Sequence, residues 1–242
     1  MTTPRIIALR GLPDEEQARR LRRDLPEAEW QWIARLRQPQ DRLRSLLGRA
    51  LARRLLAPRL DLAPARIPLT TGPHGKPLLA ALSGWHFSIA HSGDQVLAAV
   101  GPQALGVDVE RCPERVDEAL FRFATGREPG RTDPSRDGPR DETAGTTVSD
   151  AQAFCAEWVR REAVLKACGL GLTIEPGTLR LRACGQGWHR VDGPPEVRGL
   201  HVRLLGSSPG YRAALCLPAP RDDWQLTRLG LDAWLSDPEA VA

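Results

Sequence analysis

Two acidic residues stand two positions apart in the apolar run Gly106-Val107-Asp108-Val109-Glu110. If this run is a β-strand, side chains at positions i and i+2 leave the same face, so the two carboxylates lie side by side. Neighbouring carboxylates repel each other, and an interior strand face accommodates them best when a hard divalent cation lies between them. A solvated sheet edge is the alternative for this pair alone, because charged pairs are usually exposed to water.

A second charged pair, Glu162 and Lys166, stands four residues apart in a stretch that reads as a helix from Asp150 to Cys168. The spacing places both side chains on one helix face, where an ordinary surface pair is the alternative interpretation. Lys166 is unusual because this Arg-rich chain has only one other lysine, Lys76. A third carboxylate beside the first two would complete an oxygen-ligand set for Mg²⁺, and Lys166 would then face the same phosphates.

A third group lies in Gly75-Lys76-Pro77 and at His91, which ends a predicted strand just before a turn. A ring nitrogen and turn amides at that place can contact an anion, although a lone His is more often structural. The chain has no His-x-x-x-His pair, no P-loop and no Gly-x-Gly-x-x-Gly. The sequence therefore gives no support to a metalloprotease or to the usual nucleotide-binding loops.

The composition indicates a globular protein of 242 residues, long enough for one large or two small domains. The net charge of +4 comes almost entirely from Arg, which suits an anionic ligand, though a GC-rich genome also explains the general excess. Five cysteines without Cys-x-x-Cys spacing argue against a zinc site or a disulfide framework, and for a reducing cytoplasm. We expect no membrane partner, since no run of about 18 apolar residues occurs.

The elements that must position these residues are predicted to form an α+β fold in two similar-sized halves. Helices are expected at residues 14–25, around 30–33, at 40–57, 114–124 and 150–168. Strands are expected at residues 5–9, 67–70, 85–89, 95–100, 106–110, 179–183, 188–191, 200–205, 213–217 and 224–229. The acid strand is expected to neighbour the wholly apolar strand 96–100, which we place inside a sheet. Residues 125–149 carry few apolar residues and are expected to form a mobile loop.

The order of the motifs resembles the 4′-phosphopantetheinyl transferases of the surfactin-synthetase-activating type. The matching stretches are residues 41–49, 75–77, 87–94, 106–110 and 158–172, which follow one another in the family's order and spacing. The resemblance implies a pseudo-twofold monomer that binds coenzyme A in a cleft between two α+β halves, here residues 1–105 and 106–242. It also implies transfer of the phosphopantetheine arm from coenzyme A to a serine of an apo acyl or peptidyl carrier protein, with release of 3′,5′-ADP. No nucleic acid is expected as a partner.

The resemblance implies a role for each acid and for Lys166. Asp108, Glu110 and Glu162 would hold Mg²⁺ on the pyrophosphate of coenzyme A, and Lys166 would contact the phosphates. Glu162 would also accept the proton of the carrier serine, directly or through a metal-bound water, so Glu162 and Lys166 are the expected catalytic residues.

The remaining matched residues are expected to bind coenzyme A. Arg44, Lys76 and His91 would surround the 3′-phosphate and the adenine end, while Gly75 and Pro77 would line the base. Among these residues the family pattern is kept.

The chain also departs from the family at several positions. Ala90 stands where Ser is usual, Arg161 stands where Lys is usual, and Glu29 and Trp32 fall where cationic residues often precede the first motif. The predicted loop at residues 125–149 is also longer than expected, and it either reaches the carrier protein or is disordered.

Two other functions stay open from the residues alone. One is a metal-dependent phosphotransferase that uses the same acids on a different nucleotide. The other is a basic binding module for nucleic acid or an acidic protein. The second is disfavoured because the arginines are not interleaved with exposed aromatics, and Tyr211 is the only tyrosine.

Overall fold

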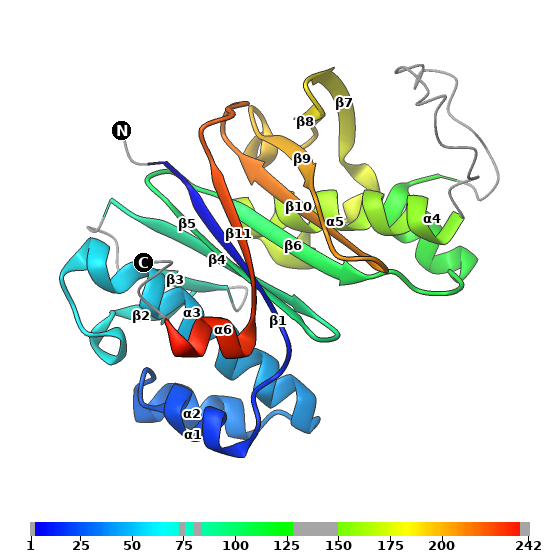
Figure 1. Ribbon diagram of the computed structural model, residues 1–242. Coiled ribbons are helices and arrows are strands. Elements are labelled where there is room, and N and C mark those ends of the chain that lie inside the picture. The colour runs from blue at the N-terminus through cyan, green and yellow to red at the C-terminus, as the bar shows by residue number, and fades with distance from the viewer. Residues whose placement is uncertain (1–2, 73–75, 80–83, 128–149, 238–242) are drawn as a thin grey trace.

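Two β-sheets, each covered on its outer face by a long helix, form the protein in the computed structural model, which describes residues 3–72, 76–79, 84–127 and 150–237 (Figure 1). The first sheet has the strand order β11 (Gln225–Gly230), β1 (Arg5–Arg10), β5 (Gln95–Gly101) and β4 (His86–Ser92). The second has the order β6 (Gly106–Arg111), β10 (Tyr211–Leu217), β9 (His201–Leu205), β8 (Trp188–Asp192) and β7 (Arg180–Gly185). A short hairpin joins β2 (Leu69–Thr71) to β3 (Pro77–Leu79).

Six α-helices lie among the described residues: α1 (Glu15–Arg22), α2 (Glu27–Ala34), α3 (Pro39–Leu60), α4 (Glu118–Thr125), α5 (Asp150–Cys168) and α6 (Leu231–Ser236). Helix α3 packs on β4 and β5, and α5 packs on β6, β9 and β10. The expected helix 150–168 is confirmed, and Gly169 ends it with a φ of +74°. Helix α4 begins later than expected because the Asp117 side chain accepts the amide protons of Ala119 and Leu120 and caps it there.

The elements build four layers with three hydrophobic cores. One core lies between the first sheet and α1 to α3, a second between the two sheets, and a third between the second sheet and α5. Strand β5 supplies Val96, Ala98 and Val100 to the first core, and Leu97 and Ala99 to the second. Both faces of β5 are therefore buried, which explains its unbroken apolar run and confirms its place inside a sheet.

The acid strand does not lie beside β5 within one sheet, as that prediction implied, although the two strands contact each other across the core between the sheets. Strand β6 is the edge strand of the second sheet, where it pairs antiparallel with β10, while β5 lies between β1 and β4 in the first sheet. The short connection from β5 to β6 crosses between sheets instead of returning within one. The reason is that Val107 and Val109 bury against the inner face of the first sheet, in the core between the sheets.

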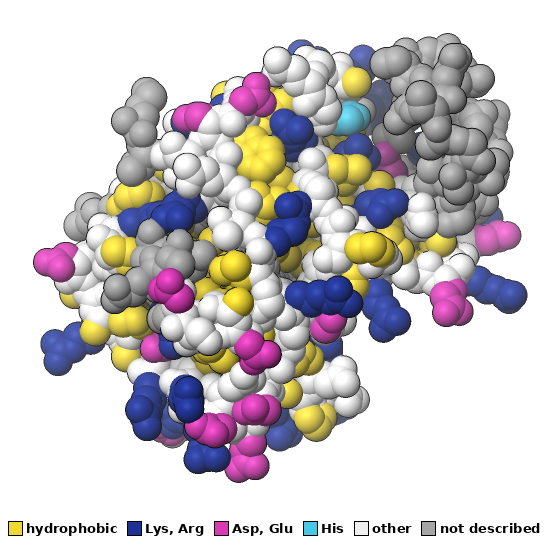
Figure 2. Space-filling model, in the orientation of Figure 1, with side chains coloured by type: hydrophobic (Ala, Val, Ile, Leu, Met, Phe, Trp, Pro, Cys, Tyr) yellow, Lys and Arg dark blue, Asp and Glu magenta, His cyan; other side chains and the backbone are white. Residues whose placement is uncertain are grey.

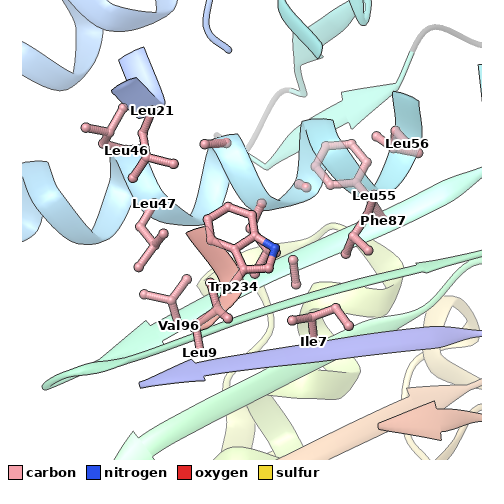
Figure 3. Close-up of a cluster of buried hydrophobic side chains, with 14 of the residues drawn as sticks. Ile7, Leu9, Leu21, Leu46, Leu47, Leu55, Leu56, Phe87, Val96 and Trp234 are labelled. Atoms are coloured by element: carbon pink, nitrogen blue, oxygen red, sulfur yellow. The ribbon is translucent and has the colours of Figure 1, made fainter. Parts of the chain in front are cut away.

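The last part of the chain returns to the first sheet. Strand β11 pairs in parallel with β1, and α6 follows it with Trp234 fully buried in the core beneath α3 (Figure 3). The structure thus confirms an α+β fold in two halves. The division between residues 105 and 106 stays a proposal. Residues 225–236 depart from it, because β11 belongs to the first sheet and α6 packs in the first core.

Arginines of α3 take part in buried ion pairs with the N-terminal helices. Arg49 and Arg53 both contact Glu29, and Arg54 contacts Asp24 at 2.6 Å. Glu29, one of the departures noted above, is therefore a structural partner of α3. On the face shown in Figure 2, the remaining cationic side chains are mixed with acidic ones.

Candidate active site

Strand β6 has one apolar face and one acidic face, as its alternation predicts. Val107 and Val109 enter the core between the sheets, so Gly106, Asp108 and Glu110 face the other way, toward α5. A Cβ atom on Gly106 would lie 2.0 Å from the carbonyl oxygen of Ala163 and 2.5 Å from the amide nitrogen of Ala167. Only glycine permits this close packing, which brings the acids of β6 against the helix that carries Glu162 and Lys166.

Asp108 is the most buried acid of the site, with 2% of its surface exposed. Its Oδ1 accepts a hydrogen bond from Nζ of Lys166 at 2.5 Å, and its Oδ2 is buried without a hydrogen-bond partner among the described residues. Burial, and then repulsion from Glu110 and Glu162, raise the pKa of Asp108 to about 7, against the attraction of Lys166. An unpartnered buried carboxylate oxygen is costly unless a cation or a donor completes it.

Glu162 and Lys166 feel the same cluster of charges. Burial raises the pKa of Glu162, and Glu110 adds to the effect, while Lys166 opposes it. Burial works to lower the pKa of Lys166, but Asp108, Glu162 and Glu110 together outweigh burial and raise it. Lys166 is therefore a protonated ammonium group among three carboxylates. This agrees with the expectation that the charged face of the helix lies against the acidic face of the strand.

A cavity of about 240 Å³ opens beside this cluster, and residues from both halves line it. Glu162 and Lys166 come from α5, Pro77 from β3, and Lys76 directly precedes β3. The other lining residues are Phe87, Ser88, Ile89, Leu165, Gly169 and Gly171. The cavity thus presents two ammonium groups and one carboxylate on largely apolar walls, which suits a phosphorylated ligand with an aromatic base.

Lys76 ties the hairpin of the first half to the helix of the second. Its Nζ donates to the carbonyl oxygen of Lys166, one of the carbonyls in the last turn of α5 that have no partner within the helix. Burial lowers the pKa of Lys76, and the charge of Lys166 adds to this effect, against the two nearby thiols Cys168 and Cys216. Both lysines of the chain therefore meet at one cavity.

Arg44 and His91 lie together at the turn between β4 and β5, outside the set of residues that lines the cavity. Arg44 donates to the Gly93 carbonyl oxygen at 3.0 Å and to Asp41 Oδ1 at 2.6 Å. Burial, then the charges of Lys166 and Arg44, lower the pKa of His91. The two residues are thus near each other and near Lys166, although Arg44 is held by its own neighbours.

The structure brings most of the predicted site residues into one region at the junction of the two halves. Gly75 lies outside the described residues, as does the predicted loop from residue 128 onward. Within the described ranges, no three His, Cys, Asp or Glu side chains form a ready-made metal site. The acids nevertheless fit a divalent cation in their chemistry, since Asp108 keeps a buried oxygen without a partner and all three carboxylates repel one another.

The sequence did not indicate the residues that form hydrogen bonds to Glu110 and to the turn after β4. Ser92 Oγ donates to Glu110 Oε2 at 2.7 Å, and the Tyr211 hydroxyl donates to Asp94 Oδ1 at 2.7 Å. Tyr211 is the only tyrosine of the chain, and no sequence pattern links β10 to the turn after β4. The periodicity of β4 would have placed Ser88 and Ser92 on one face.

Arg161, the second departure from the family pattern, is buried and points away from the cavity. It pairs with Glu157 and donates to the Pro176 carbonyl oxygen at 3.1 Å. Longer bonds reach the carbonyl oxygens of Thr125 and Leu179, both at 3.4 Å. Arg161 therefore joins α5 to the end of α4 and to the entry into β7, a task for which its planar set of donors is suited.

Comparisons with known proteins point to one family over most of the chain. A family model described as the N-terminal part of 4′-phosphopantetheinyl transferase matches residues 12–103, and a model of the 4′-phosphopantetheinyl transferase superfamily matches residues 104–216. The 4′-phosphopantetheinyl transferase Sfp of Bacillus subtilis is 27% identical over 211 residues, which cover 87% of this chain and 89% of the relative. The 4′-phosphopantetheinyl transferase psf-1 of Bacillus pumilus is 27% identical over 220 residues, 88% of this chain and 89% of the relative.

Proposed function

Because the chain belongs to the 4′-phosphopantetheinyl transferases, we propose that it moves the phosphopantetheine arm of coenzyme A to a serine hydroxyl of an apo acyl or peptidyl carrier protein and releases 3′,5′-ADP. One observation carries the proposal. Lys76, Glu162 and Lys166 line one cavity at the junction of the two halves, and Asp108 is hydrogen-bonded to Lys166 beside it.

Coenzyme A would bind with its phosphates at the two lysines. Lys166 is held charged by Asp108, so it offers a compact positive charge to the pyrophosphate. Gly75, Lys76 and Pro77 would line the adenine end, and Arg44 and His91 would contact the 3′-phosphate. The lowered pKa of His91 favours its neutral ring, and an approaching phosphate would favour the protonated form.

Asp108, Glu110 and Glu162 would hold a Mg²⁺ ion. The unpartnered Oδ2 of Asp108 supports this assignment, since it is a hard oxygen donor buried beside two further carboxylates. When bound, the ion offsets negative charge on the pyrophosphate during the transfer.

Glu162 would take the proton from the carrier serine while the serine oxygen attacks the β-phosphorus of coenzyme A. The bond from that phosphorus to the bridging oxygen of the pyrophosphate then breaks, and 3′,5′-ADP leaves with the electron pair. The raised pKa of Glu162 supports this role, because a carboxylate that binds its proton more tightly is a better proton acceptor.

We further propose that the protein works as a monomer in a reducing cytoplasm. All five cysteines are free thiols, which suits such a compartment. No described helix has the length and apolar character needed to cross a membrane.

The proposal is tested with purified protein, coenzyme A, Mg²⁺ and a panel of apo carrier proteins, and the nucleotide product is followed by chromatography. We expect one 3′,5′-ADP for each carrier modified, and no product with a carrier whose acceptor serine is changed to alanine. Asp108→Ala and Glu162→Ala should remove turnover while the protein stays folded. Release of a different nucleotide, or near-normal turnover in either variant, would contradict the assignment.

A further inference from the structure

Strand β6 has a free edge, because it begins the strand order of the second sheet. That edge faces β4, the edge strand of the first sheet, yet the two strands do not pair through their backbones. Two serine hydroxyls of β4 take the place of a pairing strand. Ser88 Oγ accepts the amide proton of Val107, and Ser92 Oγ accepts that of Arg111, both at 3.1 Å. The hydroxyls thereby satisfy two backbone donors that would otherwise lack a partner.

The spacing of these bonds shows how the two strands lie. The serines are four residues apart, and so are the amides that they accept, in the same chain direction. Strands β4 and β6 therefore run side by side in parallel, in one register, across the junction of the two halves. Any shift between the halves would break both bonds together.

Ser92 differs from Ser88 because its hydroxyl also donates a hydrogen bond, to the carboxylate of Glu110. The hydroxyl donates to Oε2 of Glu110 at 2.7 Å while it accepts the amide proton of the next residue, Arg111. A serine has one proton to donate, so the direction of this bond follows from the carboxylate being the acceptor. The bond fixes one of the two carboxylate oxygens of Glu110, Oε2.

The turn after Ser92 is held from three elements. The Tyr211 hydroxyl from β10 donates to Asp94 Oδ1 and accepts the Asp94 amide proton at 3.2 Å. Arg10 from β1 contacts Asp94 Oδ2 at 3.3 Å, and Arg44 from α3 donates to the Gly93 carbonyl oxygen. A Cβ on Gly93 would lie 2.2 Å from the Tyr211 hydroxyl, so the approach requires glycine there. Ser92 therefore sits on a turn whose position is well determined.

We propose that Ser92 is a positioning residue that orients the Glu110 carboxylate for the divalent cation, from the opposite half of the protein. The inference rests on the proposed function, because it takes Glu110 as a cation ligand. Hydrogen bonds to a ligating carboxylate typically change metal affinity by about 10-fold to 100-fold when they are lost. A residue of the first half, Ser92, would thus orient a cation ligand of the second half, Glu110.

The test measures the dissociation constant of Mn²⁺, as a probe for the divalent site, by electron paramagnetic resonance on the full-length protein with coenzyme A. Ser92→Ala should weaken Mn²⁺ binding by about 10-fold or more, and Ser92→Thr, which keeps the hydroxyl, should restore most of it. Ser236→Ala serves as a control, since Ser236 donates a bond of 2.8 Å to a backbone carbonyl in α6. It should bind Mn²⁺ like the unchanged protein.

A double-mutant cycle separates positioning from a general loss of structure. In a Glu110→Gln background, Ser92→Ala should cause little further change in Mn²⁺ affinity, because the carboxylate that Ser92 orients is gone. Independent, additive losses would overturn the inference, as would equal Mn²⁺ affinity in Ser92→Ala and the unchanged protein.

The outcomes also separate this inference from the proposed function. A protein that modifies carriers but binds Mn²⁺ equally well with and without Ser92 overturns only the role of Ser92. A protein whose Mn²⁺ affinity depends on Ser92 but that modifies no carrier overturns only the proposed function. No binding of Mn²⁺ by the unchanged protein overturns both.

Discussion

At the scale of single residues, the site depends on Asp108, whose charge is costly without a cation. It is nearly fully buried, one oxygen contacts Lys166, and the other has no partner in the described structure. Burial is the main reason that its pKa rises to about 7. A proton and a metal ion therefore compete for the same carboxylate close to neutral pH.

The first prediction follows from this competition. Because the pKa of Asp108 is raised, the carboxyl is ionised above about pH 7 and protonated below it. Affinity for Mn²⁺ should therefore be nearly constant above pH 7.5 and should fall by up to about tenfold for each pH unit below 7. Titrations at pH 6.0, 7.0 and 8.0 check this. Asp24→Asn is the control, since burial also raises the pKa of Asp24, but its partner is Arg54. A flat profile would contradict the assignment of Asp108.

Residue types alone predicted the groups of the site, and their spacing predicted which faces they share. Asp108 and Glu110 do leave one face of β6, and Glu162 and Lys166 do lie on α5. The partners of these groups could not be predicted, because Ser92, Tyr211 and Arg161 act through tertiary contacts that leave no periodic signal. Arg161 shows this clearly, since this departure from the family pattern, next to Glu162, is a buried link from α5 to the end of α4.

At the scale of elements, the site depends on how closely α5 packs on β6. The contact lies at Gly106, where even a methyl group would meet the backbone of Ala163 and Ala167. Since helix backbone cannot move aside as a flexible side chain can, any larger residue must push α5 away from the strand. Such a shift would separate Asp108 from Lys166.

The second prediction is that Gly106→Ala destabilises the protein by about 1–3 kcal/mol and also lowers turnover in the folded fraction. Denaturant unfolding gives the first quantity, and carrier modification at a temperature where the variant is folded gives the second. Gly230→Ala is the matched control, because no atom lies within 4 Å of a Cβ at that position and its φ is −67°. An equal effect of the two substitutions would contradict this account of the packing.

The long elements were the easiest to predict, and their pairing was the hardest. Helix α5 and the buried run of β5 follow from periodicity and composition. The place of β6 does not, because an apolar face on Val107 and Val109 fits either sheet equally well. In the observed arrangement, Gly106 packs against α5 and β6 pairs with β10, and the contacts of Gly106 join residues 57 or more positions apart.

At the scale of the whole molecule, the C-terminal elements β11 and α6 pack with the N-terminal strand and complete the first sheet and its core. Strand β11 adds to β1, and Trp234 of α6 fills the core beneath α3 with no exposed surface. The first half therefore depends on residues from the far end of the sequence. Loss of these residues would loosen the platform that carries Lys76, His91 and Arg44.

The third prediction tests this closure. Trp234→Ala should lower the free energy of unfolding by about 3–5 kcal/mol, because it opens a large cavity in the first core. Trp32→Ala is the matched control, since Trp32 is 49% exposed and mainly stacks on Arg49. It should cost no more than about 1 kcal/mol. Equal losses in the free energy of unfolding for the two variants, measured in urea, would contradict this role of Trp234.

The central claim is that a divalent cation held by Asp108, Glu110 and Glu162 supports transfer of the phosphopantetheine arm. The most direct measurement is the rate at which an apo carrier protein gains the arm, followed by intact mass, with Mg²⁺, after chelation, and with Glu162→Gln. We predict that the carrier gains one arm with Mg²⁺ and none after chelation. With Glu162→Gln, we predict that the arm is transferred at least about 100-fold more slowly. An unchanged rate after chelation, or no arm at all while a known transferase modifies the same carrier, would contradict the claim.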